Sequence, residues 1–417
     1  MLARRLGLGS AVVIGLGSMI GAGVFAVFGP AAQSAGTGLL LSLLIAAVVA
    51  TCNATSSAQL AAVYPQSGGT YRYGRERLGA WWGYLAGWSF VIGKTASCAA
   101  MAMTFAAYAA PDAWERPVAV AAVATLAFVN CRGVTRTARV TMVIVVVVLA
   151  VLTVVVASGV ASGLPRLEWT LPGPGLAAGY GILQASGLLF FAFAGYARIA
   201  TMGEEVTDPA RTIPRAILIA LAATVLVYGC VALSVLGALG PHALADSDEP
   251  LSAAVRATGW AWAIPLVQLG GAAASLGALL ALMAGIGRTS LAMAREADLP
   301  RWLAAVHPRY RVPHRAEIVL AIVVATLVLA LDLRGAIGFS SFGVLLYYFV
   351  ANLAAFTQPA EDRRYPRLLQ VLGMIGCGML AATLPLPSVL GGVIVLTAGL
   401  AARTIARGVS RRRRNSS

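Results

Sequence analysis

Charged residues are scarce in this sequence of 417 residues. Asp, Glu, Lys and Arg make up 11% of it, whereas 59% of the residues are hydrophobic. Soluble domains carry about 25% charged residues, so this shortage excludes an ordinary soluble domain and predicts an integral membrane protein. The first apolar run is too long for a signal peptide and has no separate cleavage site, so we expect the first helix to be retained.

Residue patterns that hold metals or disulfides are also missing. The five cysteines are scattered without a C-x-x-C pair, and the three histidines fall in predicted loops. We therefore expect no disulfide framework, no metal site and no cofactor. A membrane enzyme would need paired aspartates, a histidine and carboxylate site, or a serine beside a base, and we find no such pattern, so we expect no enzyme. The cysteines are Cys52, Cys98, Cys131, Cys230 and Cys377.

Apolar runs long enough to cross a bilayer recur along the whole chain. We count twelve and therefore predict an all-α integral membrane fold with 12 transmembrane helices. The fourth run is short, but omitting it would invert every later loop. The runs lie near 8–33, 38–63, 79–110, 117–130, 139–162, 177–203, 213–239, 260–293, 316–332, 336–357, 367–384 and 387–405.

The positions of the basic residues predict how these helices are oriented. With both termini in the cytoplasm, 25 of the 31 basic residues lie inside, 4 lie outside, and 2, Lys94 and Arg198, lie within the membrane. This bias predicts a multi-pass protein of the cell membrane with cytoplasmic N- and C-termini. It also accounts for the net charge of +15 without a nucleic-acid partner. The basic run 411–414 is explained as an anchor near anionic membrane lipid.

Two spans show the signs of a helix that breaks. Residues 15–30 read GLGSMIGAGVFAVFGP and contain five glycines, each of which costs a helix about 1 kcal/mol relative to alanine. The sixth span, 181–203, is also interrupted by glycine and runs in the opposite direction. Small residues also serve close helix packing, but two breaks at matching positions are typical of inverted-repeat transporters.

These breaks predict a 5+5 inverted repeat with broken helices 1 and 6 and two C-terminal helices. We assign the first five-helix repeat to 1–162 and the second, inverted repeat to 163–358. The two additional helices occupy 359–405, and a basic cytoplasmic tail occupies 406–417.

Four motifs carry a resemblance to a known family. They are GSMIGAGVF in the first span, YPQSGGTYRY with LGAWWG around the start of the third, GEEVTDP with Ile213-Pro214 after the sixth, and AMAREADLP with Val306-His-Pro308 after the eighth. Together they resemble the amino acid-polyamine-organocation (APC) superfamily of transporters. The resemblance implies a small-molecule amino acid substrate that is moved by alternating access.

The resemblance also implies a substrate site at the two breaks. Relatives hold the substrate carboxylate on backbone amides of the first break, in keeping with the attraction of a helix N-terminus for anions. They hold the substrate ammonium against carbonyls of the sixth span, where Phe191 would be an aromatic lid or else an ordinary core or lipid-facing phenylalanine. The residues implied are Gly21, Ala22 and Gly23 for the carboxylate and Phe191, Ala194 and Gly195 for the ammonium, and Ile20 is expected in the same substrate site.

The sequence departs from this family at the positions that couple transport to an ion. Many relatives have a lysine in the fifth span, where this sequence has Val148, and an acid in the third span, where it has Lys94, its only lysine. Lys94 lies about 11 residues into its span, or roughly 16 Å along a helix, and desolvation disfavours the charged form of an amine. We predict that Lys94 borders the substrate and serves as the proton-coupling base, the alternative being a lysine whose charge never changes.

Arg198 is the other basic residue within the membrane. It lies late in the sixth span, close to Glu204 and Glu205, and either extends to the cytoplasmic surface or pairs with these acids to close an inner gate.

The sequence therefore predicts a secondary active transporter of neutral amino acids with proton coupling. The charged side chain of a cationic substrate would need a carboxylate as its partner within the membrane, and the predicted site has none. The alternatives are a permease or exchanger of cationic amino acids or polyamines, a transporter-like amino acid sensor, and a channel, which would need a lined pore. The sequence does not indicate the oligomeric state.

Overall fold

The computed structural model describes residues 6–65, 68–133, 138–164, 175–203 and 205–415. Within these ranges the regular structure is helical, and the only β-type pairing is an isolated parallel bridge between Leu6 and Val206. Nine helical segments of the described chain are long and apolar enough to cross a membrane. The protein is therefore an all-α membrane protein, as predicted, while the count of 12 spans stays a prediction.

The helices match the predicted spans in order. The first span consists of α1, α2 and α3, the sixth of α9, a 3-10 turn (η3) and α10, and the others of one helix each. In chain order they are α1 (Leu8–Met19), α2 (Ala22–Ala26), α3 (Phe28–Ala35), α4 (Leu39–Val63), α6 (Ala80–Ala109), α7 (Glu115–Cys131), α8 (Ala138–Ala161), α9 (Leu176–Phe193), η3 (Ala194–Tyr196), α10 (Ala197–Ala200), α11 (Pro209–Ala245), α13 (Ile264–Arg295), α14 (His314–Ala330), α15 (Leu333–Phe356), α16 (Arg367–Thr383) and α17 (Leu386–Asn415).

Two short helices lie between the spans. They are α5 (Gly69–Leu78), which follows α4, and α12 (Pro250–Ala257), which follows α11. Short 3-10 turns occupy Gly36–Gly38, Asp112–Trp114, Ala261–Ala263, Arg301–Ala304 and Ala360–Asp362.

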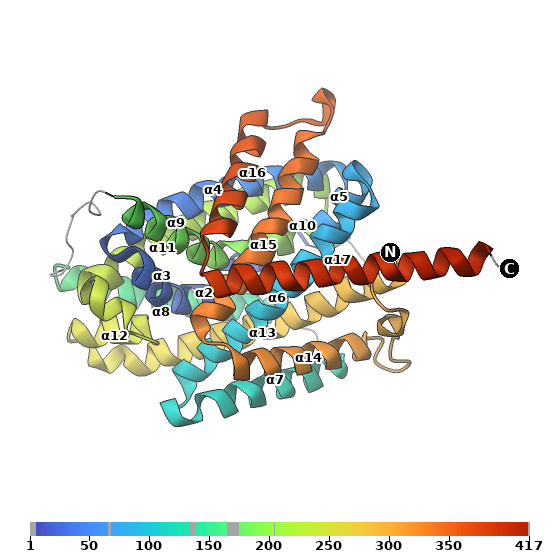
Figure 1. Ribbon diagram of the computed structural model, residues 1–417. Coiled ribbons are helices and arrows are strands. Elements are labelled where there is room, and N and C mark those ends of the chain that lie inside the picture. Colours follow the sequence, from blue (N-terminus) through green and yellow to red (C-terminus); the bar gives the residue numbers. More distant parts are fainter. Residues whose placement is uncertain (1–5, 66–67, 134–137, 165–174, 204, 416–417) are drawn as a thin grey trace.

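Helix α6 lies in the middle of the bundle and packs most extensively against α13 and α15 (Figure 1). Gly93 of α6 and Gly343 of α15 face each other so closely that a Cβ on Gly93 would lie 3.1 Å from the Gly343 Cα. Small residues let membrane helices approach in this way. Along one edge of the molecule α7 and α14 lie side by side, and α17 crosses the bundle and extends beyond it.

The predicted break in the first span is present. Helix α1 ends at Met19, Ile20 has φ −81° and ψ 60°, and α2 begins at Ala22. These angles form an inverse γ-turn, in which the Gly21 N–H donates to the Met19 carbonyl at 2.8 Å. The chain then continues through Val27, which is in the right-handed helical region, into α3.

The sixth span is interrupted differently. Helix α9 ends at Phe193, and one 3-10 turn, Ala194–Tyr196, leads directly into α10. The span tightens here and does not unwind into an extended segment. Its carbonyls near Ala192 and Ala194 therefore change direction while the chain stays helical, because a 3-10 turn offsets each donor by one residue.

Candidate functional site

The two interrupted spans touch through glycines. A Cβ on Gly195 would overlap the Ser18 carbonyl and lie 2.6 Å from the Met19 nitrogen, and a Cβ on Gly23 would lie 2.8 Å from the Ala192 Cα. Backbone therefore meets backbone at both points. Only glycine allows this approach without displacing the opposite chain.

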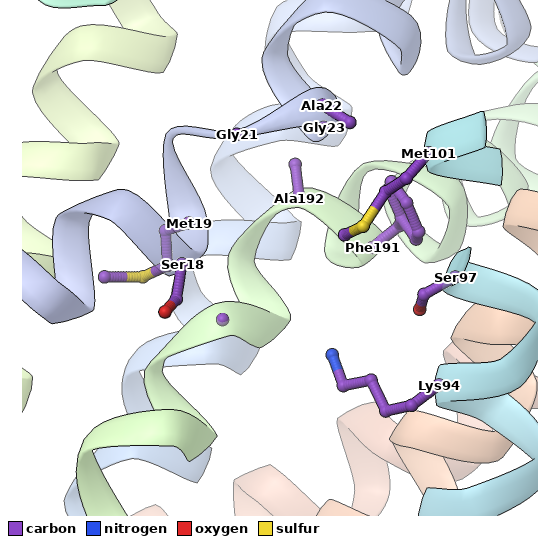
Figure 2. A pocket seen from close by; sticks show the side chains of 11 residues that line it. Ser18, Met19, Gly21, Ala22, Gly23, Lys94, Ser97, Met101, Phe191 and Ala192 are labelled. Atoms are coloured by element: carbon purple, nitrogen blue, oxygen red, sulfur yellow. The ribbon is translucent and has the colours of Figure 1, made fainter. Parts of the chain in front are cut away.

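A small cavity lies where these breaks face α6 (Figure 2). Its volume is about 20 Å³, which is close to what a single water molecule needs. An amino acid therefore requires the lining side chains to move. The lining residues are Ser18, Met19, Gly21, Ala22, Gly23, Lys94, Ser97, Met101, Phe191, Ala192 and Gly195.

Most of the residues that the sequence implicates lie around this cavity. Gly21, Ala22, Gly23, Lys94, Phe191 and Gly195 line it. Ile20 does not, because it forms the centre of the γ-turn and is 2% exposed. Ala194 contributes through its carbonyl, which the Lys94 ammonium contacts.

The structure adds residues that the sequence argument missed. Ser97 and Met101 lie one and two turns beyond Lys94 on α6, and the helical spacing of three and seven residues would have placed them on its face. Ser97 also shares a hydrogen bond with Ser340 of α15, with 2.6 Å between the two hydroxyl oxygens. Apart from lying next to the predicted breaks, no feature of the sequence distinguishes Ser18, Met19 and Ala192 as site residues.

Lys94 is the 15th of the 30 residues of α6 and is buried. Figure 2 shows its side chain extending from α6 into the space between the helices, and its Nζ donates to the Ala194 carbonyl at 3.3 Å. No ion pair of the described residues involves Lys94. The hydroxyl of Tyr348 on α15 lies 3.4 Å from the same carbonyl oxygen.

Tyr228 of α11 connects the two interrupted spans. Its hydroxyl oxygen lies 2.6 Å from the Met19 carbonyl oxygen and 3.1 Å from that of Ala192. The tyrosine ring packs 5.1 Å from the Phe193 ring, between centroids. A single side chain from the seventh span therefore contacts the end of α1 and the end of α9.

Comparison with known proteins shows to which family the chain belongs. The family described as "Amino acid permease" matches residues 6–404, which is nearly the whole chain. The chain belongs to this family. It is 59% identical to an uncharacterized transporter of Mycobacterium tuberculosis, over all of this chain and 94% of that protein.

More distant relatives of this permease carry substrate names. It is 29% identical to cationic amino acid transporter 7, chloroplastic, of Arabidopsis thaliana, over 82% of this chain and 63% of that protein. It is 24% identical to the branched-chain amino acid permease BcaP of Bacillus subtilis, over 89% of this chain and 84% of that protein. The family is therefore one of amino acid transporters.

The permease is closed on the side of the cavity that we predict faces outward. Arg334 of α15 donates to Gln33 Oε1 at 3.0 Å, to Ser34 Oγ at 2.9 Å and to Gln184 Oε1 at 2.9 Å. Gln33 and Ser34 lie on α3, and Gln184 lies on α9. One guanidinium thus joins α3 and α9, which we predict to be the outer parts of the two broken spans, to α15 through neutral acceptors.

The opposite end of the permease is closed by hydrogen bonds to backbone carbonyls. The Leu6 N–H donates to the Glu205 carbonyl at 3.1 Å, and the Thr207 N–H donates to the Leu6 carbonyl at 2.9 Å. The Tyr73 hydroxyl of α5 donates to the Ala200 carbonyl at 3.2 Å. The N-terminal segment and α5 therefore both cover the end of the sixth span.

Two of the predicted gate residues, Arg198 and Glu205, lie at this same end. Arg198 donates to the Thr201 hydroxyl at 3.3 Å and is near enough to Glu205 to interact electrostatically. Among the described residues no ion pair joins Arg198 to Glu205, and Glu204 lies outside them. Pairing between Arg198 and these acids stays a prediction.

An ionic cluster lies beside this closure. Asp298, which follows α13, is fully buried and pairs with Arg403 of α17 at 2.7 Å and with Arg75 of α5 at 3.1 Å. The Tyr71 hydroxyl donates to the same carboxylate at 2.9 Å. Burial raises the pKa of Tyr71, and the Asp298 charge adds to this effect, so the phenol keeps its proton. The cluster fastens α5 and α17 to the end of α13.

Proposed function

We propose that this permease is a secondary active transporter that moves neutral amino acids across the cell membrane by alternating access with proton coupling. The observation that carries the proposal is the cavity at the meeting point of the two broken spans. It brings the start of α2, the carbonyls of the sixth span and one buried amine together. Half-helix ends at such a point are typical of substrate sites in transporters.

The two ends of an amino acid have separate partners in this arrangement. The start of α2 presents the N–H groups of Ala22 and Gly23, which favour a carboxylate. The Ala194 carbonyl is an acceptor for the substrate ammonium, but the Lys94 ammonium occupies it at 3.3 Å. Substrate binding therefore requires Lys94 to leave this carbonyl.

Lys94 has an obvious second partner once the substrate is bound. The substrate carboxylate would lie at the α2 end of the same cavity, which Lys94 also lines. A charged Lys94 that turns to this carboxylate leaves the Ala194 carbonyl to the substrate ammonium. Because only the protonated lysine stabilises the carboxylate in this way, substrate and proton bind together, which is the basis of symport.

The same geometry supports a neutral substrate side chain. A cationic side chain would add a second positive charge beside Lys94, and charge in the membrane needs a partner. No described carboxylate lines the cavity. Transport of cationic amino acids is the second candidate, because several relatives are named as cationic amino acid transporters.

A ligand screen on the purified protein tests the proposal and separates the two candidates. A ligand that binds the native state raises the midpoint of thermal unfolding. We expect alanine, serine, leucine or another neutral amino acid to raise it more than arginine, lysine or a polyamine. Saturable uptake of the same amino acid into proteoliposomes then distinguishes a transporter from a sensor or a channel. A stronger effect of arginine than of every neutral amino acid would overturn the neutral assignment.

A further inference from the structure

Tyr228 is buried in the bundle at 1% exposure, yet it ends in a polar group. Its hydroxyl lies within hydrogen-bonding distance of the Met19 and Ala192 carbonyls, at 2.6 and 3.1 Å. Packing explains the ring, because it lies against Phe193. Packing does not explain the hydroxyl, because a phenylalanine would fill the same space without one.

The two carbonyls are available because each lies at the end of a helical segment. Met19 is the last residue of α1. Among the backbone hydrogen bonds of the described residues that lie outside regular helices, its carbonyl accepts one, from the Gly21 N–H of the γ-turn. Ala192 lies one residue before the end of α9, where the pattern changes to a 3-10 turn. A carbonyl oxygen has two lone pairs, and an unsatisfied one is costly in a buried site.

Two carbonyl oxygens that converge from two helix breaks carry partial negative charge and favour the binding of a cation. In transporters with discontinuous helices, unwound carbonyls and half-helix C-terminal ends coordinate sodium or protons. Here the point of convergence is occupied by a hydroxyl from a third helix. The neighbouring Ala194 carbonyl is likewise taken by donors, the Lys94 ammonium and the Tyr348 hydroxyl.

We propose that the Tyr228 hydroxyl stands in for a coordinating cation and is a positioning residue of the transport site. Its one proton is shared between the Met19 and Ala192 carbonyls and holds the end of α1 against the end of α9. The α2 amides and the sixth-span carbonyls therefore keep a fixed relation while the lining side chains move to admit an amino acid. The effect of Tyr228 on the substrate rests on the proposed function, whereas its effect on cation binding does not. The consequence is a site whose two broken spans stay joined without sodium.

Thermal unfolding of the purified full-length protein tests the cation part without any substrate. The midpoint is measured in sodium chloride, lithium chloride and choline chloride at equal ionic strength. We expect the wild type to unfold at the same temperature in all three. A sodium-specific rise of the wild-type midpoint that saturates with concentration would overturn the proposal.

The variant Tyr228→Ser provides a readout that loss of packing alone would not give. It removes the ring and leaves both carbonyls beside space for a cation. We expect sodium, but not choline, to raise the midpoint of this variant. A lowered midpoint that is the same in every salt would mean that Tyr228 is only a core side chain.

The variant Tyr228→Phe keeps the ring and tests the positioning role. Tyr84→Phe is the matched control, because the Tyr84 hydroxyl is also buried and also donates to a carbonyl, that of Gly399 at 2.7 Å, away from the cavity. With labelled L-alanine or L-leucine as the probe, we expect Tyr228→Phe to bind about tenfold more weakly, which corresponds to about 1.4 kcal/mol and to one buried hydrogen bond. Equal affinities in Tyr228→Phe and Tyr84→Phe would overturn the positioning role. If no amino acid binds the wild type, the proposed function fails and the salt experiments still decide the role of Tyr228.

Discussion

The Lys94 ammonium lies 3.3 Å from the carbonyl oxygen of Ala194, at the position where family resemblance expects the ammonium of the substrate. The substrate ammonium therefore displaces the Lys94 ammonium from this acceptor. The displaced lysine turns to the substrate carboxylate, and this connects the charge of Lys94 to substrate binding, because an opposite charge nearby favours the protonated lysine.

Substrate charge is the first property that this relationship predicts. Arginine and lysine should compete for uptake less well than alanine, serine or leucine, since their side chains add positive charge beside Lys94. In Lys94→Met, which removes that charge, the discrimination against arginine should fall by about a hundredfold, as expected for a like-charge contact of about 3 kcal/mol. Competition assays with labelled L-alanine measure both ratios. Undiminished discrimination in Lys94→Met would show that another group excludes cations.

The contact between Gly23 and Ala192 predicts the effect of a larger side chain. In Gly23→Leu the new Cβ would lie 2.8 Å from the Ala192 Cα, so the two broken spans must separate. Overpacking of this kind costs about 1 to 3 kcal/mol, and we expect amino acid binding to be lost while the protein is still expressed. Gly9→Leu is the control, because nothing lies within 4 Å of a Cβ at Gly9. Normal binding by Gly23→Leu would remove this stretch from the site.

The three hydrogen bonds of the Arg334 guanidinium predict how the cavity opens on the side that we predict faces outward. Arg334→Gln should lose the three hydrogen bonds to α3 and α9, so that the cavity is reached more often from outside. The measurement is labelling of a cysteine at Met101, a cavity residue, by a membrane-impermeant thiol reagent. We expect faster labelling in Arg334→Gln than with Arg334 intact, and an intermediate rate in Arg334→Lys, which keeps the charge without the guanidinium. Equal rates in all three would mean that Arg334 does not hold this side closed.

The Asp298 cluster predicts a large loss of stability from one substitution. In Asp298→Asn two guanidinium groups lose their shared carboxylate, and breaking a buried ion pair costs about 3 to 5 kcal/mol. Glu296→Gln is the matched control, since its pair with Arg75 at 2.9 Å is half exposed, and an exposed pair is worth about 0 to 1 kcal/mol. Thermal unfolding should separate the two variants clearly. Similar midpoints would show that the cluster does not fasten α5 and α17.

Much of the fold follows from features that are local in the sequence. The spans follow from apolar runs, and the break after Met19 follows from the glycines around it, because both depend on neighbouring residues. The position of Lys94 at mid-helix also follows from simple counting along α6. The 3-10 turn at Ala194 was expected only as a break, because glycine and aromatic content does not distinguish tightening from unwinding.

The contacts between distant residues could not be predicted in the same way. Tyr228 lies on α11 with no motif around it, and its importance depends on two carbonyls that belong to other helices. Asp298 belongs to a recognisable motif, but its partner Arg403 looked like one more cytoplasmic base. Charge counting predicts the side of the membrane on which a residue lies, but it does not identify the partner of that residue.

Proton-driven uptake is the most direct test of the central claim that Lys94 couples a neutral amino acid to a proton. The neutral amino acid that most stabilises the purified protein is measured in proteoliposomes, with and without an inward proton gradient and with sodium replaced by choline. Lys94→Gln removes the titrating group, and Lys94→Arg keeps a charge that cannot be lost. The account predicts that the gradient accelerates wild-type uptake independently of sodium, and that both variants lose this response while exchange of internal for external amino acid persists. An unchanged response to the gradient in Lys94→Gln, or wild-type uptake that requires sodium, would contradict it.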